Sequence, residues 1–515
     1  MNKNSLSKAW RQYEAGRKYK QKIGLYETVR ENERFYRGDQ WRGGSGELPR
    51  PVFNVVRRIT DNLISNAAVG EVRITYTDEN LPFSESAAEA AAISEGVRIL
   101  TENAAYRWEK DKLQSLIYRI LTDAALTGDG IVYCGWDADA DGGGVWRGDI
   151  FTGAIDNVNV FPADVNNPDI QSQSHVIISG KARLADLRAE ALANGASRED
   201  VMKITPDSRD DTVDSMAGDF AAVEYDYEPE DAPVTYLIKF WKENGFVVFE
   251  KSTKNCVIRR SVTPCKLYPL AKFSWSGTKN CFHGNSAVSG MIANQKYINR
   301  AFAMVMKHMT DTAFSKVIYD RTRIPEWTNQ VGEAIAAVGG GNISDAVQVV
   351  GTGALEDGYL DVIEKAVTMT KDLAGATEAA LGNVDPNNTS AILALRESSM
   401  QALERVRAEL NICLEQMANI WADMICGYCL DGNLLRTKNG AEKIRTDLLR
   451  GAMLHAKIDV SDSSRFSVSG TQTILDNLLK DGHIDLCEYL ERLPDGLVPN
   501  RYGLLSAREK EGGDA

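Results

Sequence analysis

The chain has little of what enzymes use for catalysis. Histidine occurs only five times in 515 residues, and no two of these histidines stand at the spacing of metal ligands. The sequence contains no Walker A loop, no HExxH motif, no nucleophile elbow and no glycine fingerprint of dinucleotide-binding proteins. Carboxylates are numerous, but no pair of them stands out as an acid and a base. These absences predict a protein that is not an enzyme and that needs no cofactor and no metal.

Long apolar runs and a cysteine framework are also missing. No stretch approaches the ~20 apolar residues of a membrane helix, and the first residues do not resemble a secretory signal, so we expect a cytosolic protein without membrane contact. The eight cysteines are scattered, which predicts reduced thiols. Cys426 and Cys429 form the only CxxC pair, and no second pair completes a zinc site. We interpret this pair as structural and leave open whether it has another role.

The charge of the chain is acidic and unevenly distributed. The formal net charge is −13, and residues 206–233 hold ten acidic residues against Arg209. This composition predicts an acidic loop, for which a solvated connection is favoured over a binding tail. Proteins that hold DNA tightly need many lysine and arginine contacts to phosphates, so the acidic total argues against tight binding. It does not argue against a protein that lets DNA pass.

Periodicity predicts an α+β fold that is mainly helical. Helical patterns cover residues 6–36, begin again at Asn54, and cover residues 84–127. Strands are expected at residues 131–136, 149–155, 158–161 and 175–179. Two further strands, 235–242 and 246–251, flank Asn244 and Gly245, a dipeptide typical of a type I′ hairpin turn.

Two helices of opposite charge are expected in the second half of the chain. Residues 285–309 have helical periodicity and carry Lys296, Arg300 and Lys307 but no acidic residue. Residues 355–381 have a formal charge of −4, with Asp361 and Glu364 among the acids. Opposite charges predict that these helices lie side by side. Between them we expect a compact unit of strand 314–319, helix 326–338 and strand 346–350.

The rest of the chain is expected to be mostly helical. Gly382 and Pro386 interrupt the pattern, and a long apolar stripe then predicts one helix over residues 389–430. A short helix at 442–454, a strand at 455–460 and tail helices at 471–479 and 484–492 follow. The last helix offers only Arg492 as a cation, which argues against a helix that reads the DNA major groove.

Several segments resemble the portal (head-tail connector) proteins of tailed bacteriophages. They are residues 32–41 (NERFYRGDQW), Tyr268 and Pro269 with Phe273, residues 283–286 (HGNS), residues 294–299 (NQKYIN), and the tail segments 475–479 and 489–494. The resemblance spans essentially the whole chain, and it lies in the combination because no single motif is diagnostic.

The resemblance implies a ring of subunits, twelve in this family, at one vertex of the capsid. Genome DNA enters through such a ring and later leaves through it, and the packaging ATPase (terminase), the major capsid protein and a head-tail adaptor are the implied partners. The protein would be in the host cytoplasm during assembly and in the virion afterwards. The implied parts are a wing (residues 1–282 and 431–469), stem helices (283–309 and 355–381), a clip (310–354), a tunnel loop (382–388), a spine helix (389–430) and a crown (470–515).

The resemblance also implies roles for particular residues. The tunnel loop would face DNA through Asn383, Val384, Asp385, Pro386, Asn387 and Asn388. Lys296, Arg300, Lys307, Asp361 and Glu364 would lie between stems or on the channel wall. Arg321, Arg323, Glu326 and Trp327 of the clip would contact the terminase or the adaptor. The alternatives are a cytosolic enzyme or scaffold that uses the long helix as a dimer seam and, for the tunnel loop, an ordinary surface connection.

Overall fold

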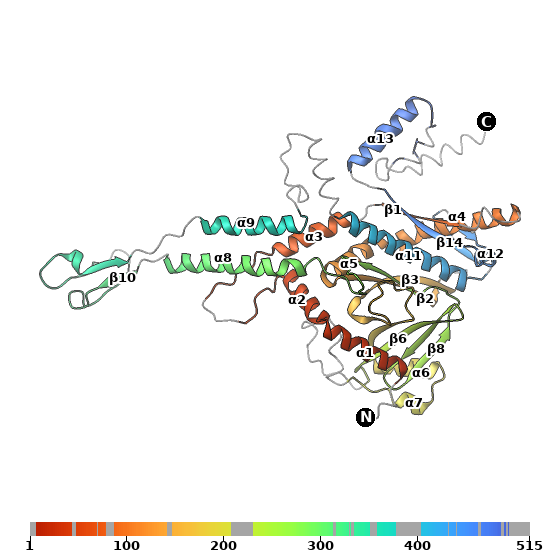
Figure 1. Ribbon diagram of the computed structural model, residues 1–515, viewed down its shortest axis with the longest axis horizontal. Helices are drawn as coiled ribbons and strands as arrows, with labels where there is room; N and C mark the ends of the chain where they lie inside the picture. Colours follow the sequence, from red (N-terminus) through yellow and green to blue (C-terminus); the bar gives the residue numbers. More distant parts are fainter. Residues whose placement is uncertain are drawn as a thin grey trace.

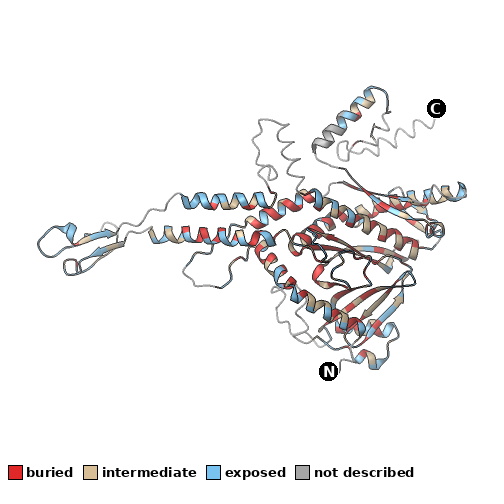
Figure 2. Ribbon diagram, viewed as in Figure 1, coloured by how far each residue is buried: buried red, intermediate tan, exposed pale blue. Residues whose placement is uncertain are grey.

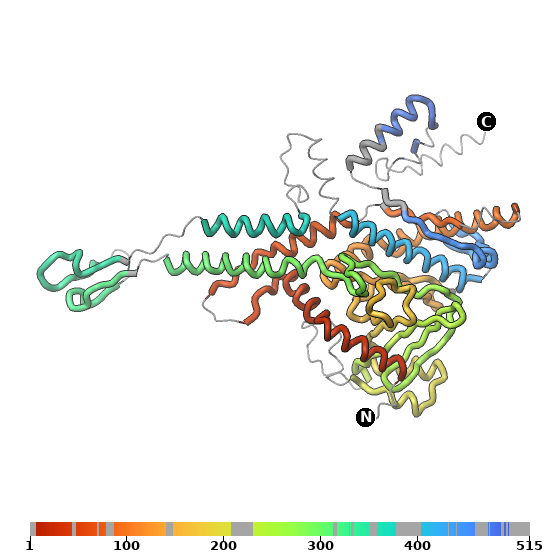
Figure 3. Tube along the Cα trace, in the orientation of Figure 1, coloured from red at the N-terminus to blue at the C-terminus, as the bar shows by residue number. Residues whose placement is uncertain are grey.

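One long extension projects from a body of helices and sheets (Figure 1). The computed structural model describes residues 7–43, 48–68, 71–78, 87–141, 147–207, 230–312, 316–328, 330, 334–350, 358–376, 403–430, 432–438, 440–461, 465–485, 489–490 and 493. The chain runs outward along α8 (Ile292–Thr312), forms the hairpin of β10 (Lys316–Tyr319) and β11 (Val347–Val350), and returns along α9 (Gly358–Leu373). Figure 3 traces this path away from the body and back.

The described part of residues 1–127 contains a strand, given below, and five helices: α1 (Lys8–Lys22), α2 (Leu25–Arg37), α3 (Val55–Ala67), α4 (Ala87–Lys110) and α5 (Leu113–Thr127). The expected start at Asn54 is confirmed, because its side chain caps α3 by accepting a hydrogen bond from the Arg57 N–H. The single helices expected over 6–36 and 84–127 are each two helices. Gly24 and Lys112 take left-handed conformations, with φ of 69° and 50°, and turn the chain there.

Two antiparallel sheets form the middle of the body. The three-stranded sheet has the order β3 (Arg147–Asp156), β2 (Asp129–Asp141) and β9 (Leu270–Ser274). The five-stranded sheet runs β4 (Val160–Pro162), β5 (His175–Arg183), β6 (Pro233–Glu243), β7 (Phe246–Ser252) and β8 (Val257–Val262). Between β5 and β6 the chain forms α6 (Leu184–Ala193) and α7 (Arg198–Met202). The predicted hairpin turn is confirmed, since Asn244 and Gly245 both have positive φ, 52° and 84°.

The main core surrounds α11 (Glu404–Tyr428), which packs against β9 and β14. Trp421 on this helix is fully buried and donates a hydrogen bond from Nε1 to Thr152 Oγ1 at 3.0 Å. The long helix expected over 389–430 is thus confirmed for its described part, whereas residues 389–402 lie outside the described residues.

The last segments of the body mix strands and helices. β14 (Leu454–Ser461) pairs with β1 (Glu71–Asp78), a strand that the sequence analysis missed. The prediction of a helix over 442–454 was wrong in part. Its first residues belong to a hairpin that β12 (Leu434–Thr437) and β13 (Gly440–Lys443) form. Only α12 (Thr446–Leu449) is helical there, and α13 (Arg465–Lys480) follows β14.

Two predictions for the extension need correction. Helix 285–309 begins only at Ile292, after a 3-10 turn, because Asn285 bridges to Ser276 and remains extended. The strands of the strand-helix-strand unit are present as the β10–β11 hairpin, but the described residues between 326 and 338 are not helical. Ile335 and Val338 are exposed there, so little apolar burial is available to stabilise a helix in the described part of this segment.

Candidate assembly surface and its anchor

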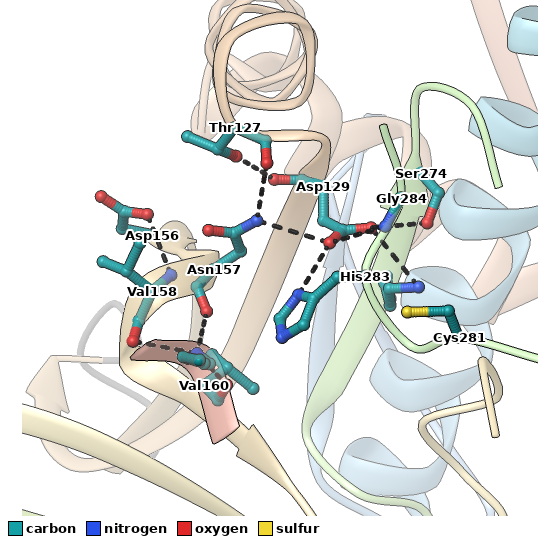
Figure 4. A network of polar contacts seen from close by, with 12 residues as sticks. Thr127, Asp129, Asp156, Asn157, Val158, Val160, Ser274, Cys281, His283 and Gly284 are labelled. Atoms are coloured by element: carbon teal, nitrogen blue, oxygen red, sulfur yellow. Dashed lines mark hydrogen bonds and ion pairs between the residues drawn. The ribbon is translucent and has the colours of Figure 1, made fainter. Parts of the chain in front are cut away.

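A buried polar cluster holds the start of the extension against the body (Figure 4). Its centre is the carboxylate of Asp129, the first residue of β2, which is fully buried. The carboxylate accepts hydrogen bonds from Ser274 Oγ at 2.6 Å and from the Gly284 N–H at 3.0 Å. Lys272 Nζ lies 3.5 Å away and forms an ion pair with it. Through these contacts one side chain joins β2, β9 and the segment that leads to α8.

His283 completes this cluster. Its Nδ1 lies 3.1 Å from Asp129 Oδ2, and because a carboxylate only accepts, Nδ1 carries the proton. Burial alone would raise the pKa of Asp129, but the hydrogen bond from His283 and the charge of Lys272 outweigh it and hold the pKa at about 2. Burial lowers the pKa of His283, so the imidazole is neutral. The cluster therefore contains one carboxylate and one ammonium, whose charges compensate each other.

Two glycines allow the close approach of the chain segments at this point. Gly128 has a φ of +100°, and a Cβ atom on it would lie 2.3 Å from the carbonyl oxygen of Gly284. A side chain here would push β2 away from the segment leading to α8.

Buried amides form a second anchor between α8 and the N-terminal helices. Gln295 accepts hydrogen bonds from the N–H groups of Val55 and Val56, at 3.1 and 3.2 Å, and so caps α3. Its Nε2 donates to Asn299 Oδ1 at 2.9 Å, and Asn299 donates in turn to Gln40 Oε1 at 2.7 Å. These contacts join residues 32–41 and 294–299, two of the segments on which the portal resemblance was based.

The helices α8 and α9 pack side by side, as their opposite charges predicted. The contact itself is apolar, however, with Ala301 and Val305 of α8 against Ile363 of α9. Lys296 forms an ion pair with Glu31 of the body at 2.7 Å, and Lys307 one with Asp311 of its own helix at 3.3 Å. Arg300, Asp361 and Glu364 are exposed. Within the described chain, none of the three α8 cations is paired with α9.

Many residues along both stem helices are exposed (Figure 2), and large apolar residues are among them. Their exposed fractions lie between 41% and 83%. The residues are Tyr297, Met304, Met306 and Met309 on α8 and Tyr359, Leu360, Val362, Met369 and Leu373 on α9. We call this set the stem apolar surface. Met369 and Leu373 stand four residues apart and so lie on the same side of α9, and contiguous exposed apolar surface of this kind marks contacts with other molecules.

The hairpin at the end of the extension carries the residues predicted for the clip. Trp327 stacks on Tyr319 of β10, with ring centroids 5.2 Å apart. Arg323 donates a hydrogen bond to the Asn342 carbonyl at 3.2 Å, and Arg321 and Glu326 are exposed. The structure thus brings all four residues to one end of the molecule, while the predicted tunnel loop, 383–388, lies outside the described residues.

Features of other protein classes are not found in the described chain. Nowhere in it do three histidine, cysteine, aspartate or glutamate residues gather so that they could hold a metal ion. None of its helices is long and apolar enough to span a bilayer. Cys426 and Cys429 are buried, and burial raises their pKa values to about 12 and about 11. Both are therefore neutral thiols that pack in the core, which agrees with the structural interpretation.

Comparison with known proteins supports the portal resemblance. Residues 243–451 match the family model of the phage P22-like portal protein. The matched region covers the end of the five-stranded sheet, the stem, the hairpin and α11, about two fifths of the chain. No curated protein matches the chain. The predicted resemblance to the portal proteins of tailed phages is thus confirmed, and it supports a phage portal role.

Proposed function

Taking the chain as a portal protein of a tailed bacteriophage, we propose that its subunits close into a ring around a central channel. The ring occupies one vertex of the capsid, DNA is packaged and ejected through it, and twelve subunits form it, the number implied by the family resemblance. The observation that supports the ring most directly is the stem apolar surface. It lies on an extension that the body does not cover, so it is available to neighbouring subunits.

The contact between subunits is proposed to combine apolar burial with charge. On α8 each stem carries Arg300 and also Lys307, which is paired with Asp311, and on α9 it carries Asp361 and Glu364. In a ring, every subunit meets its neighbours through two different faces, so a basic face can meet an acidic face at each contact. The acidic net charge of the chain is compatible with a channel through which DNA slides without being held.

The remaining parts have proposed roles that follow from their positions. The hairpin, with Arg321, Arg323, Glu326 and Trp327, is the proposed contact for the terminase and the adaptor because it lies at the end of the extension. Residues 383–388 are proposed to face DNA on the basis of their sequence and the family resemblance alone.

Replacing the hairpin tests this assignment. A variant in which residues 316–350 are exchanged for a short glycine-serine linker should still form rings, because the stem and body are unchanged. Phage carrying it should fail to package DNA or to attach tails, which nuclease protection and electron microscopy would reveal. Normal packaging and normal tails in that phage would contradict the role of the hairpin.

A further inference from the structure

A groove lies at the end of the body remote from the hairpin, where β7 and β8 meet α11 and α12 (Figure 1). Its volume is about 1010 Å³. Phe246, Val262 and Met453 are among the residues that line it. These three side chains are 41%, 64% and 58% exposed, so the groove offers apolar surface to solvent.

Three polar side chains that line the groove are bonded within the protein. Asp423 accepts hydrogen bonds from the N–H groups of Lys266 and Leu267, at 2.7 and 2.8 Å. Asn419 accepts one from the Ala456 N–H at 2.8 Å, and Arg450 Nε donates to the Cys426 carbonyl at 2.7 Å. A ligand therefore meets mainly apolar surface here, not unsatisfied polar groups.

Cations dominate the charge of the groove. Lys266 and Arg450 line it and are exposed, whereas the only acidic side chain in its lining, Asp423, has its pKa raised by burial. Arg259, on the same strand as Val262, is also exposed, whereas Arg260 of this strand is paired with Glu243 at 3.2 Å. In a chain with a net charge of −13, this local excess of positive charge favours an acidic ligand.

The strand beside the groove has a free edge. Within the described chain, β8 pairs only with β7. At the opposite edge of the same sheet, α1 lies against β4, and Lys20 Nζ donates a hydrogen bond to the Val160 carbonyl at 2.6 Å. An open strand edge can accept a further strand from another chain through main-chain hydrogen bonds.

We propose that β8 and this groove bind an extended segment, rich in apolar and acidic residues, from a different protein of the virion. The segment adds a strand to the free edge of β8 and inserts an apolar side chain between Phe246, Val262 and Met453. We assign the groove to a different protein because the proposed ring contact lies on the stem, away from this groove. The proposal rests on the proposed function, because the partner is taken to belong to the capsid shell around the ring.

The test places a photo-crosslinking amino acid, p-benzoylphenylalanine, at Phe246 in phage that carry the variant. Phe151, on β3, is 46% exposed and is the matched control position. Rings are first verified by electron microscopy, so that a failure of the proposed function is recognised separately. After irradiation, position 246 should crosslink to another virion protein, within a peptide that mass spectrometry shows to contain acidic and apolar residues. Position 151 should give no such product.

Two further variants make the test specific. Val262→Asp places a negative charge on the rim, and Lys266→Glu reverses a lining cation; both side chains are exposed, so folding should be unaffected. Each should reduce the crosslink at position 246 several-fold. Crosslinks to a second copy of this chain, a peptide without acidic residues, no crosslink in assembled particles, or a crosslink unchanged by both variants would each overturn the proposal.

Discussion

Asp129 and His283 lie 154 residues apart in the sequence, and their side chains meet at 3.1 Å in the buried cluster from which the stem starts. The pair also contacts Lys272, so the cluster combines a carboxylate, an ammonium and a neutral imidazole. Because buried polar groups are costly when unpaired, each member depends on the others. This cluster is the most direct link between the sheets of the body and the stem that carries the proposed ring contact.

Asp129→Ala should destabilise the protein by about 3–5 kcal/mol, since it leaves Lys272 as an uncompensated buried charge. Chemical denaturation followed by tryptophan fluorescence would measure the change. Asp139→Ala, at an exposed position of the same strand, is the control and should change stability by less than about 0.5 kcal/mol. Equal effects of the two variants would show that the cluster does not stabilise the junction.

His283 should make stability depend on pH. In the folded protein the pKa of His283 lies below its ordinary value of ~6.5. At pH values between the lowered pKa and the ordinary one, His283 is protonated more often in the unfolded chain than in the folded protein. Stability conferred by neutral His283 is therefore complete above about pH 6.5 and is lost as the pH falls, by at most ~1.4 kcal/mol per pH unit.

His283→Asn retains a hydrogen-bond donor for Asp129, but its side chain does not titrate. The difference between the unfolding free energies of the variant and of the native protein should therefore change between pH 7 and pH 5. Denaturation curves at a series of pH values give this difference. His483→Asn, at an exposed histidine, is the control. A difference that stays constant over this pH range in the His283 variant would contradict the assignment of a lowered pKa.

The stem apolar surface should be required for assembly but not for folding. Leu373 is 83% exposed, so Leu373→Asp should leave the subunit folded. If a neighbouring subunit covers Leu373, burial of this side chain contributes ~1.5–3 kcal/mol to the contact between the subunits. Its loss should lower the affinity of each contact by a factor of about ten or more. Met202→Asp is the matched control, since Met202 is 69% exposed but lies on α7, away from the stem. Sedimentation velocity would compare the two, and equal assembly of both variants would count against the stem contact.

Reversing Lys296, Arg300 and Lys307 to Glu should also weaken assembly, most clearly at low salt. Exposed ion pairs contribute only ~0.2–1 kcal/mol each, but every contact in the ring repeats them. Lys296 is paired with Glu31 and Lys307 with Asp311 of the same subunit, so the unfolding free energy of the separated triple-variant subunit gives the part of the effect that arises within the subunit. Native-like assembly of the triple variant at low salt would place these cations on the channel wall or toward solvent instead.

Local signals predicted local structure well. Asn244-Gly245 has the positive φ values that its hairpin turn requires, and Asn54 caps the helix that follows it. The α8–α9 pair was also predicted, although from charge, whereas Ala301, Val305 and Ile363 form the contact. Long-range polar contacts could not be predicted in this way. Nothing in the local sequence indicates that Asp129 meets His283, beyond the glycines on both sides of Asp129.

The helix expected at 326–338 shows why composition alone is insufficient. Alanine-rich sequence favours a helix, but a short helix needs packing against another element, and Ile335 and Val338 are exposed. The roles assigned to residues 383–388 and to the clip residues remain predictions, because they concern DNA and partner proteins.

The mass of the assembled particle tests the central claim most directly. Mass photometry of the purified chain, with negative-stain images of the same sample, should show rings with a central channel. Twelve chains of 56.7 kDa give a mass of about 680 kDa, and neighbouring ring sizes would still support a closed ring. A protein that remains a monomer or dimer at every salt and protein concentration would contradict the account.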